Sequence, residues 1–105
     1  MDNKIYDLKA DLLSALGHGN RIRILEFLKN GEKCNCDIYP ALDLEQSNLS
    51  RHMKILQEAG IVSARKDGLK VYYNILDSRI YDLIDGVTEI VKTNLKRSLE
   101  LIDQL

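Results

Sequence analysis

The chain has 105 residues and a mass of 12.0 kDa, with 45% hydrophobic and 30% charged residues, so we expect one soluble globular domain over residues 1–105. No apolar run approaches the roughly 20 residues that cross a membrane, and the charged amino-terminal stretch does not resemble a secretion signal, which indicates a cytoplasmic protein without a membrane partner. The net charge of −1 argues against a nucleic-acid binder, but residues 46–74 carry five cations and only two acids, and DNA responds to this local field.

Apolar residues at helical spacing predict two helices at the start of the chain. The first runs from about Asn3 to Leu16 and is ended by glycines. The second runs from Arg21 to Lys29, with Asn20 as a suitable N-cap. His18 lies in the break between them, where we interpret it as a structural residue.

A short third helix is expected from Asp37 to Leu42. Taking Asp37 as its N-cap places Pro40 in the first turn, where proline loses no intrahelical hydrogen bond. Together with a helix from Glu45 to Ala59, it forms a predicted helix-turn-helix over residues 37–59.

The helix from Glu45 to Ala59 carries the main functional signal. Its Leu49, Met53 and Leu56 fall on one side at spacings of four and three. The opposite side holds hydroxyl and cationic side chains and no acid, whereas a solvated helix face usually mixes both signs. Such a face suits a helix in the DNA major groove, because phosphates and base edges interact with these donors.

Two strands are expected directly after this helix, over residues 61–75. Val62, Ala64, then Val71, Tyr73 and Ile75 alternate with polar residues, which is the period of half-buried strands. The dipeptide Asp67-Gly68 between the two runs predicts a type I′ hairpin turn. Cations surround this turn, so the hairpin is predicted to act as a wing that grips the phosphate backbone.

The last predicted helix begins with Asp77 as N-cap and runs to about Gln104. Its apolar stripe is too long for so small a domain to cover, so we expect residues 1–16 and 77–105 to form a homodimer. The fold class is therefore mainly α with a small β-hairpin, in the order four helices, two strands, one helix. The candidate DNA-binding residues are Gln46, Ser47, Asn48, Ser50, Arg51, Lys54, Arg65, Lys66 and Lys70.

Two segments carry a family resemblance. The run Ser47-x-x-Ser50-x-His52-Met53-x-x-Leu56-x-x-Ala59-Gly60-Ile61-Val62, and the run Ala15-Leu16-Gly17-His18-x-x-Arg21-Ile22-Arg23-Ile24-Leu25 before it, resemble the ArsR/SmtB family of winged-helix metalloregulatory repressors. The resemblance covers nearly the whole chain. It implies a sequence-specific transcriptional repressor that binds double-stranded operator DNA as a homodimer and needs no cofactor for that binding. In this family the histidine equivalent to His52 usually supports the groove helix.

The two cysteines, Cys34 and Cys36, form the most informative short motif outside the predicted DNA surface. They lie just before a predicted helix start, where amide groups favour the thiolate that binds soft metals or is oxidised. Their spacing resembles the C-x-C-D/E element of thiol-sensing family members, which implies a sensor for As(III), Sb(III) or Cd(II), with Asp37 as a further candidate ligand. Tyr39 stands where the arsenic pattern has a third cysteine, and the last helix lacks the histidines of the zinc site.

Three interpretations of the cysteine pair therefore stay open: a thiophilic metal or metalloid sensor, a redox sensor, and a pair without sensory role in a repressor that responds to something else. A thiol enzyme is disfavoured, because such enzymes usually carry their thiols over a βα sheet. The expected two strands cannot build that sheet, and beyond Asp37 no histidine or carboxylate arrangement for acid–base catalysis accompanies the pair.

Overall fold

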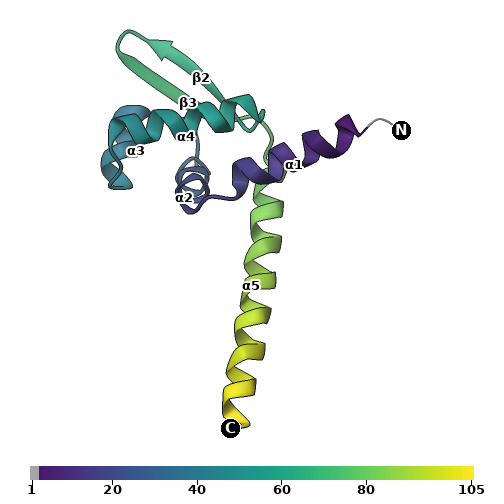
Figure 1. The fold of residues 1–105 in the computed structure, drawn as a ribbon. Coiled ribbons are helices and arrows are strands. Elements are labelled where there is room, and N and C mark those ends of the chain that lie inside the picture. The colour runs from purple at the N-terminus through teal and green to yellow at the C-terminus, as the bar shows by residue number, and fades with distance from the viewer. Residues whose placement is uncertain (1–2) are drawn as a thin grey trace.

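The computed structural model describes residues 3–105, which form five helices and one antiparallel sheet of three strands (Figure 1). The order is α1 (Lys4–Leu16), α2 (Gly19–Phe27), β1 (Lys33–Cys34), α3 (Asn35–Ala41), α4 (Gln46–Glu58), β2 (Val62–Asp67), β3 (Lys70–Ile75) and α5 (Arg79–Asp103). The order of the helices and the hairpin confirms the predicted fold class. The strand β1 was not predicted.

The hydrophobic core lies where α2, α3, α4 and the hairpin meet. The predicted stripe of α4 is confirmed, because Leu49, Met53 and Leu56 are all buried in this core. The other elements contribute Ala15, Ile24, Leu25, Leu28, Ile38, Ile61, Val62, Tyr73 and Ile80. Because this stripe is buried, the opposite face of α4 is the one exposed to solvent.

Two helices begin earlier than the sequence suggested. Helix α2 begins at Gly19, and His18 rather than Asn20 is its N-cap, since His18 Nδ1 accepts from the Asn20 amide at 3.1 Å. Helix α3 begins at Asn35 rather than after Asp37, and its N-cap is Cys34, whose Sγ accepts from the Cys36 amide at 3.1 Å. The expected placement of Pro40 in the first turn was therefore wrong, because Pro40 lies inside α3, where it has no N–H for the carbonyl four residues earlier.

The sheet has the order β1-β3-β2, and its register corrects the predicted turn. Asp67 pairs with Lys70, so the two central turn residues are Gly68 and Leu69 rather than Asp67 and Gly68. Gly68 has φ +63° and Leu69 is not among the described residues with positive φ. Positive φ at the first central position alone is typical of a type II′ turn, so the predicted type I′ turn was wrong.

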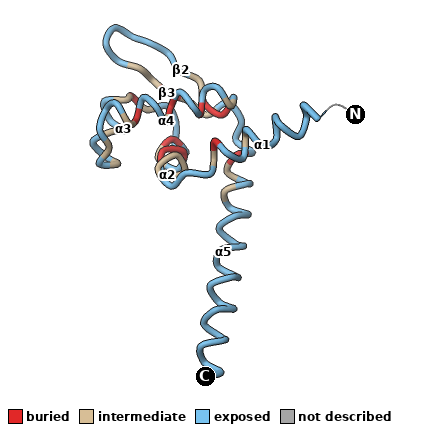
Figure 2. Tube along the Cα trace, in the orientation of Figure 1, coloured by how far each residue is buried: buried red, intermediate tan, exposed pale blue. Residues whose placement is uncertain are grey.

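Helices α1 and α5 project from this core, and α5 is the long rod that ends at the C-terminus in Figure 1. Apart from Ile80, which is buried, most of the predicted stripe of α5 is exposed, as the pale blue tube in Figure 2 shows. The exposed apolar residues of α5 are Leu83, Val87, Ile90, Val91, Leu95, Leu99, Leu101 and Ile102. Within residues 3–105, no helix combines the length and apolar character that spanning a membrane requires.

Candidate nucleic-acid interface and thiol pair

The solvent-facing side of α4 holds most of the candidate DNA-binding residues. A tight turn leads into the helix, with Asp43 at φ +55° and the Leu44 amide donating to the Tyr39 carbonyl at 2.9 Å. Because the apolar stripe is buried, Gln46, Ser47, Ser50, Arg51 and Lys54 are exposed. Asn48 is half-buried, and its Oδ1 accepts a hydrogen bond from Arg51. From Gln46 to Lys54 none of the exposed side chains is acidic, so this part of the face offers donors without competing carboxylates, and the acid of α4, Glu58, lies at the last residue of the helix.

The wing holds the other three candidates, all exposed. Lys66 and Lys70 flank the turn, and neither forms an ion pair with a carboxylate in the described chain. Arg65 is held instead: its Nη2 lies 2.8 Å from Oε1 of Glu32, and its guanidinium lies 4.6 Å from the centre of the Tyr72 ring. The hydrogen bond between Arg65 and Glu32 lowers the pKa of the Glu32 carboxyl and raises the pKa of the Arg65 guanidinium.

Glu32 supports the wing, although it lies before β1 and no pattern in the sequence predicts this role. Besides its bond to Arg65, its Oε2 accepts from Asn74 Nδ2 at 2.5 Å. Arg65 is on β2 and Asn74 on β3, so one carboxylate fixes both strands of the hairpin. Glu32 lies more than thirty residues before either partner, which is why spacing in the sequence could not reveal the contact.

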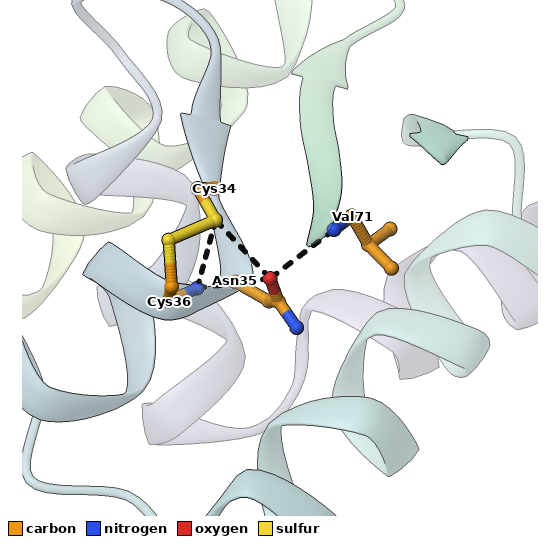
Figure 3. The surroundings of a disulfide bond; sticks show 4 residues. All are labelled: Cys34, Asn35, Cys36 and Val71. Carbon is orange, nitrogen blue, oxygen red and sulfur yellow. Dashed lines mark hydrogen bonds between the residues drawn. A yellow bond between two sulfur atoms is a disulfide. The ribbon is translucent and has the colours of Figure 1, made fainter. Parts of the chain in front are cut away.

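Figure 3 shows that the two cysteines lie together at the start of α3 and form a disulfide. Cys34 is 3% exposed, whereas Cys36 and Asp37 are exposed. Asn35 between them accepts at Oδ1 from the Cys36 amide at 2.9 Å and from the Val71 amide at 3.2 Å. Cys34 itself belongs to β1 and pairs with Tyr72 of β3. The cysteine pair is therefore attached to the wing as well as to α3.

The donor set for a thiophilic ion is limited in the described part of the chain. Residues 3–105 contain no group of three or more His, Cys, Asp and Glu side chains placed to hold a metal. Cys34 and Cys36 in the reduced state supply two soft sulfur ligands, which suits a thiophilic ion. A four-coordinate site of the zinc type needs two further ligands, so these residues fit such an ion only in part.

The two histidines contact each other beside α4. Their ring centroids lie 4.5 Å apart, and Nδ1 of His52 lies 3.3 Å from Nη1 of Arg21. Arg21 also donates to the carbonyls of Ala15 and Ser14, at 2.6 and 3.2 Å. Burial lowers the pKa of His52, and the positive charges around it add to this effect. His52 thus joins α4 to the junction of α1 and α2, which agrees with the expected supporting role.

Comparison with known proteins gives a consistent result. Residues 18–64 match the family model described as bacterial regulatory protein, arsR family. An HTH-type transcriptional regulator of Methanocaldococcus jannaschii is 40% identical over 86 residues, which covers 81% of this chain and 97% of that protein. The arsenical resistance operon repressor of Staphylococcus aureus is 34% identical over 89 residues, covering 85% of this chain and 86% of that protein.

A solved structure extends the similarity to three dimensions. The solution structure of a homodimeric winged helix-turn-helix DNA-binding domain from Mycobacterium bovis, described as a possible ArsR-family regulator, superposes with a TM-score of 0.78. The two sequences are 28% identical, and the match covers 92% of each chain. The long projecting α5 and the hairpin are thus features of a fold that has already been observed.

Proposed function

The chain belongs to the arsR family of bacterial regulatory proteins, and from that premise we propose that it is a cytoplasmic, homodimeric repressor that binds operator DNA through α4 and the wing. The observation that carries the proposal is the exposed face of α4, which holds no acid from Gln46 to Lys54, beside a cationic hairpin. A relative from S. aureus is named an arsenical resistance operon repressor, and repression is the activity that we propose for this chain.

The proposed roles follow from the side chains. Gln46, Ser47, Asn48 and Ser50 project from the first half of α4 and present amides and hydroxyls to base edges, while Arg51 and Lys54 reach bases or phosphates. Lys66 and Lys70 contact phosphates from the wing, as does Arg65 once it is released from Glu32 or through its remaining donors. This division predicts that α4 sets sequence specificity and the wing adds affinity.

A second copy of the chain is the proposed partner of α1 and α5. A groove of about 460 Å³ between α1, α2 and α5 is lined by apolar residues that include Leu13, Ile22, Leu83, Val87 and Val91. Exposed apolar surface of this extent marks an interaction site, and the M. bovis domain with the same fold is a homodimer. A two-fold dimer would place two α4 helices about one DNA turn apart, which suits a palindromic operator.

We further propose that the cysteine pair regulates DNA binding. As the sensor of a thiophilic ion, the reduced pair binds As(III), Sb(III) or Cd(II) through both sulfurs, with Asp37 or a small thiol completing the shell, and releases the operator. The relative in S. aureus is named for arsenical resistance, which supports this version. The alternative is a redox switch, in which the two cysteines are oxidised and bind no metal. The Cys34–Cys36 disulfide favours this version.

In the redox version a peroxide is the oxidant. One thiolate attacks the peroxide, takes an oxygen to become a sulfenic acid and releases hydroxide or an alkoxide. The second thiol then attacks that sulfur and expels water, which leaves the disulfide. Either version acts on the same two structures, because Cys34 caps α3 and pairs with β3. The third possibility, a repressor whose cysteines are not sensory, predicts no effect of either agent.

One titration separates these versions. The reduced dimer is bound to DNA from the region upstream of its own gene, and As(III), Cd(II), Zn(II) or hydrogen peroxide is added while fluorescence anisotropy reports affinity. A loss of affinity with As(III) or Cd(II) that is absent in a Cys34→Ser/Cys36→Ser variant supports metal sensing. A loss with peroxide alone supports redox sensing. Unchanged affinity with all four agents would exclude a sensory role for the pair and leave DNA binding intact.

A further inference from the structure

A polar groove along one side of α4 adjoins the DNA-binding surface proposed above and shares Asn48 and Arg51 with it. It has a volume of about 430 Å³ and lies between the start of α2 and α4. It is lined by His18, Asn20, Arg21, Asn48, Arg51 and His52, with Ile55 as an apolar neighbour. No carboxylate lines it, although acids make up 16 of the 105 residues of the chain.

The two arginines bring positive charge that no acid balances. Arg21 donates to two backbone carbonyls and to Nδ1 of His52, and Arg51 donates to Oδ1 of Asn48. The ion pairs among residues 3–105 involve other cations, namely Arg65, Arg79 and Lys92. Two guanidinium groups at one groove favour an anion there, because the attraction is stronger beside the protein than in bulk water.

The histidines add two donors whose position is fixed. Nδ1 of His18 accepts from the Asn20 amide, and Nδ1 of His52 accepts from Arg21. A neutral ring that accepts at Nδ1 carries its hydrogen on Nε2. Within the described chain neither Nε2 has a hydrogen-bond partner. Both rings therefore retain an N–H for an acceptor, and the lowered pKa of His52 keeps that ring in its neutral form near pH 7.

We propose that this groove binds a phosphodiester of the DNA backbone on the side of α4 away from the wing, an inference that rests on the proposed function. The major groove that admits a helix is about 12 Å wide and has a phosphate backbone on each side. Figure 1 shows α4 between the hairpin and α2. The wing reaches one backbone and this groove reaches the other, while Arg51 belongs to both the groove and the exposed face of α4.

The substitution Asn20→Asp tests the site with little change in shape. The new carboxylate would still accept from Arg23 Nη1, which lies 3.1 Å from Oδ1 of Asn20, and an acid in the first turn of α2 favours the helix. Folding is therefore expected to be unaffected or slightly more stable. We expect DNA affinity to fall about tenfold, and the slope of log affinity against log salt to become shallower by about 0.9, the value for one lost phosphate contact.

The matched control is Asn3→Asp, which makes the same charge change at the N-cap of α1, at the far end of that helix from α4. If Asn20→Asp and Asn3→Asp bind duplex DNA with equal affinity and equal salt slope, the phosphate site is wrong while the DNA-binding function stands. If the wild-type chain binds no duplex from its own upstream region, both proposals fail.

The NMR signals of the two histidine rings distinguish a phosphodiester of DNA from free inorganic phosphate as the group that binds. In ¹H–¹⁵N spectra of the wild-type dimer, the Nε2 signals of His18 and His52 are expected to shift on adding duplex DNA. Inorganic phosphate at the same concentration of phosphate groups should leave them unchanged. Shifts with inorganic phosphate and not with DNA would overturn the backbone assignment and indicate a site for a small oxyanion.

Discussion

Oδ1 of Asn35 lies 3.2 Å from the backbone nitrogen of Val71, so the residue between the two cysteines is hydrogen-bonded to the strand that forms half of the wing (Figure 3). The same oxygen accepts from the Cys36 amide at 2.9 Å. A change at the cysteines that moves Asn35 therefore changes the support of β3 directly. This contact links the proposed sensor to the proposed DNA-binding surface.

Replacing Asn35 by alanine is expected to weaken that link. The amides of Cys36 and Val71 lose a partner, which should cost about 1–2 kcal/mol of unfolding free energy. Asn35→Asp retains an acceptor oxygen and serves as the control. Urea unfolding gives the stability, and DNA affinity before and after oxidation gives the coupling. An Asn35→Ala variant that responds to oxidation like the wild type would show that Asn35 does not transmit the signal.

Met53 tests the buried stripe of α4. It is 0% exposed at the centre of the core, so Met53→Ala should leave a cavity and lower the free energy of unfolding by about 2–5 kcal/mol. The neighbouring Lys54 is exposed, and Lys54→Ala should change stability by about 0.5 kcal/mol or less. Urea denaturation of both variants checks the prediction. Equal stability of the two would contradict the orientation of α4.

The stripe of α5 tests the dimer. Val91 lines the groove between α1, α2 and α5, so Val91→Glu would bury a charge at the proposed interface and should raise the dimer dissociation constant about a hundredfold, an effect of about 3 kcal/mol. Thr93 is exposed on the other side of α5, and Thr93→Glu is the matched control. Sedimentation equilibrium of both variants measures the change. A dimer unaffected by Val91→Glu would place the interface elsewhere.

The start of α5 predicts a dependence of stability on pH. Hydrogen bonds from the side chain and backbone of Arg79 lower the pKa of Asp77 from 3.8 to about 2. A lowered pKa in the folded state means that Asp77 stabilises the fold above about pH 4, and that this contribution is lost as pH falls towards 2.

The wild type should therefore have a higher melting temperature than Asp77→Asn at pH 6, and the difference should close between about pH 4 and 2. Asp103→Asn, at the exposed far end of α5, is the control for removing a carboxylate elsewhere on the same helix. Thermal melts followed by circular dichroism give both curves. A constant difference over this range would mean that the carboxylate charge of Asp77 is not responsible for it.

The parts of the fold that follow a period were predictable from the sequence. The stripe of Leu49, Met53 and Leu56 determined which face of α4 is buried, and with it which candidate DNA-binding residues are exposed. The strands β2 and β3 followed from alternation in the same way, and Tyr73 is buried in the core while Tyr72 is half-buried, as that alternation requires. The spacing of apolar residues along a helix or strand reflects which of its faces is buried, so these features could be predicted without knowing contacts between distant segments.

The features that were missed depend on contacts between distant segments. The two-residue strand β1 has no period of its own and exists because Lys33 and Cys34 pair with β3. The turn was placed one residue too early, because the pairing of Asp67 with Lys70 depends on the register of the whole hairpin. The groove beside α4 joins Arg21 to His52 across 31 residues, and no local pattern predicts that contact.

The most direct test of the central claim is the salt dependence of DNA binding by wild type and two double variants. Affinity for duplex DNA from the upstream region of its own gene is measured by fluorescence anisotropy between about 50 and 200 mM salt. Lys66→Ala/Lys70→Ala should bind more weakly, with a slope shallower by about 1.8, the value for two lost phosphate contacts. Arg51→Ala/Lys54→Ala should lose affinity and discriminate less between this DNA and a scrambled duplex. If both double variants bind with the affinity and salt slope of the wild type, α4 and the wing do not form the DNA-binding surface.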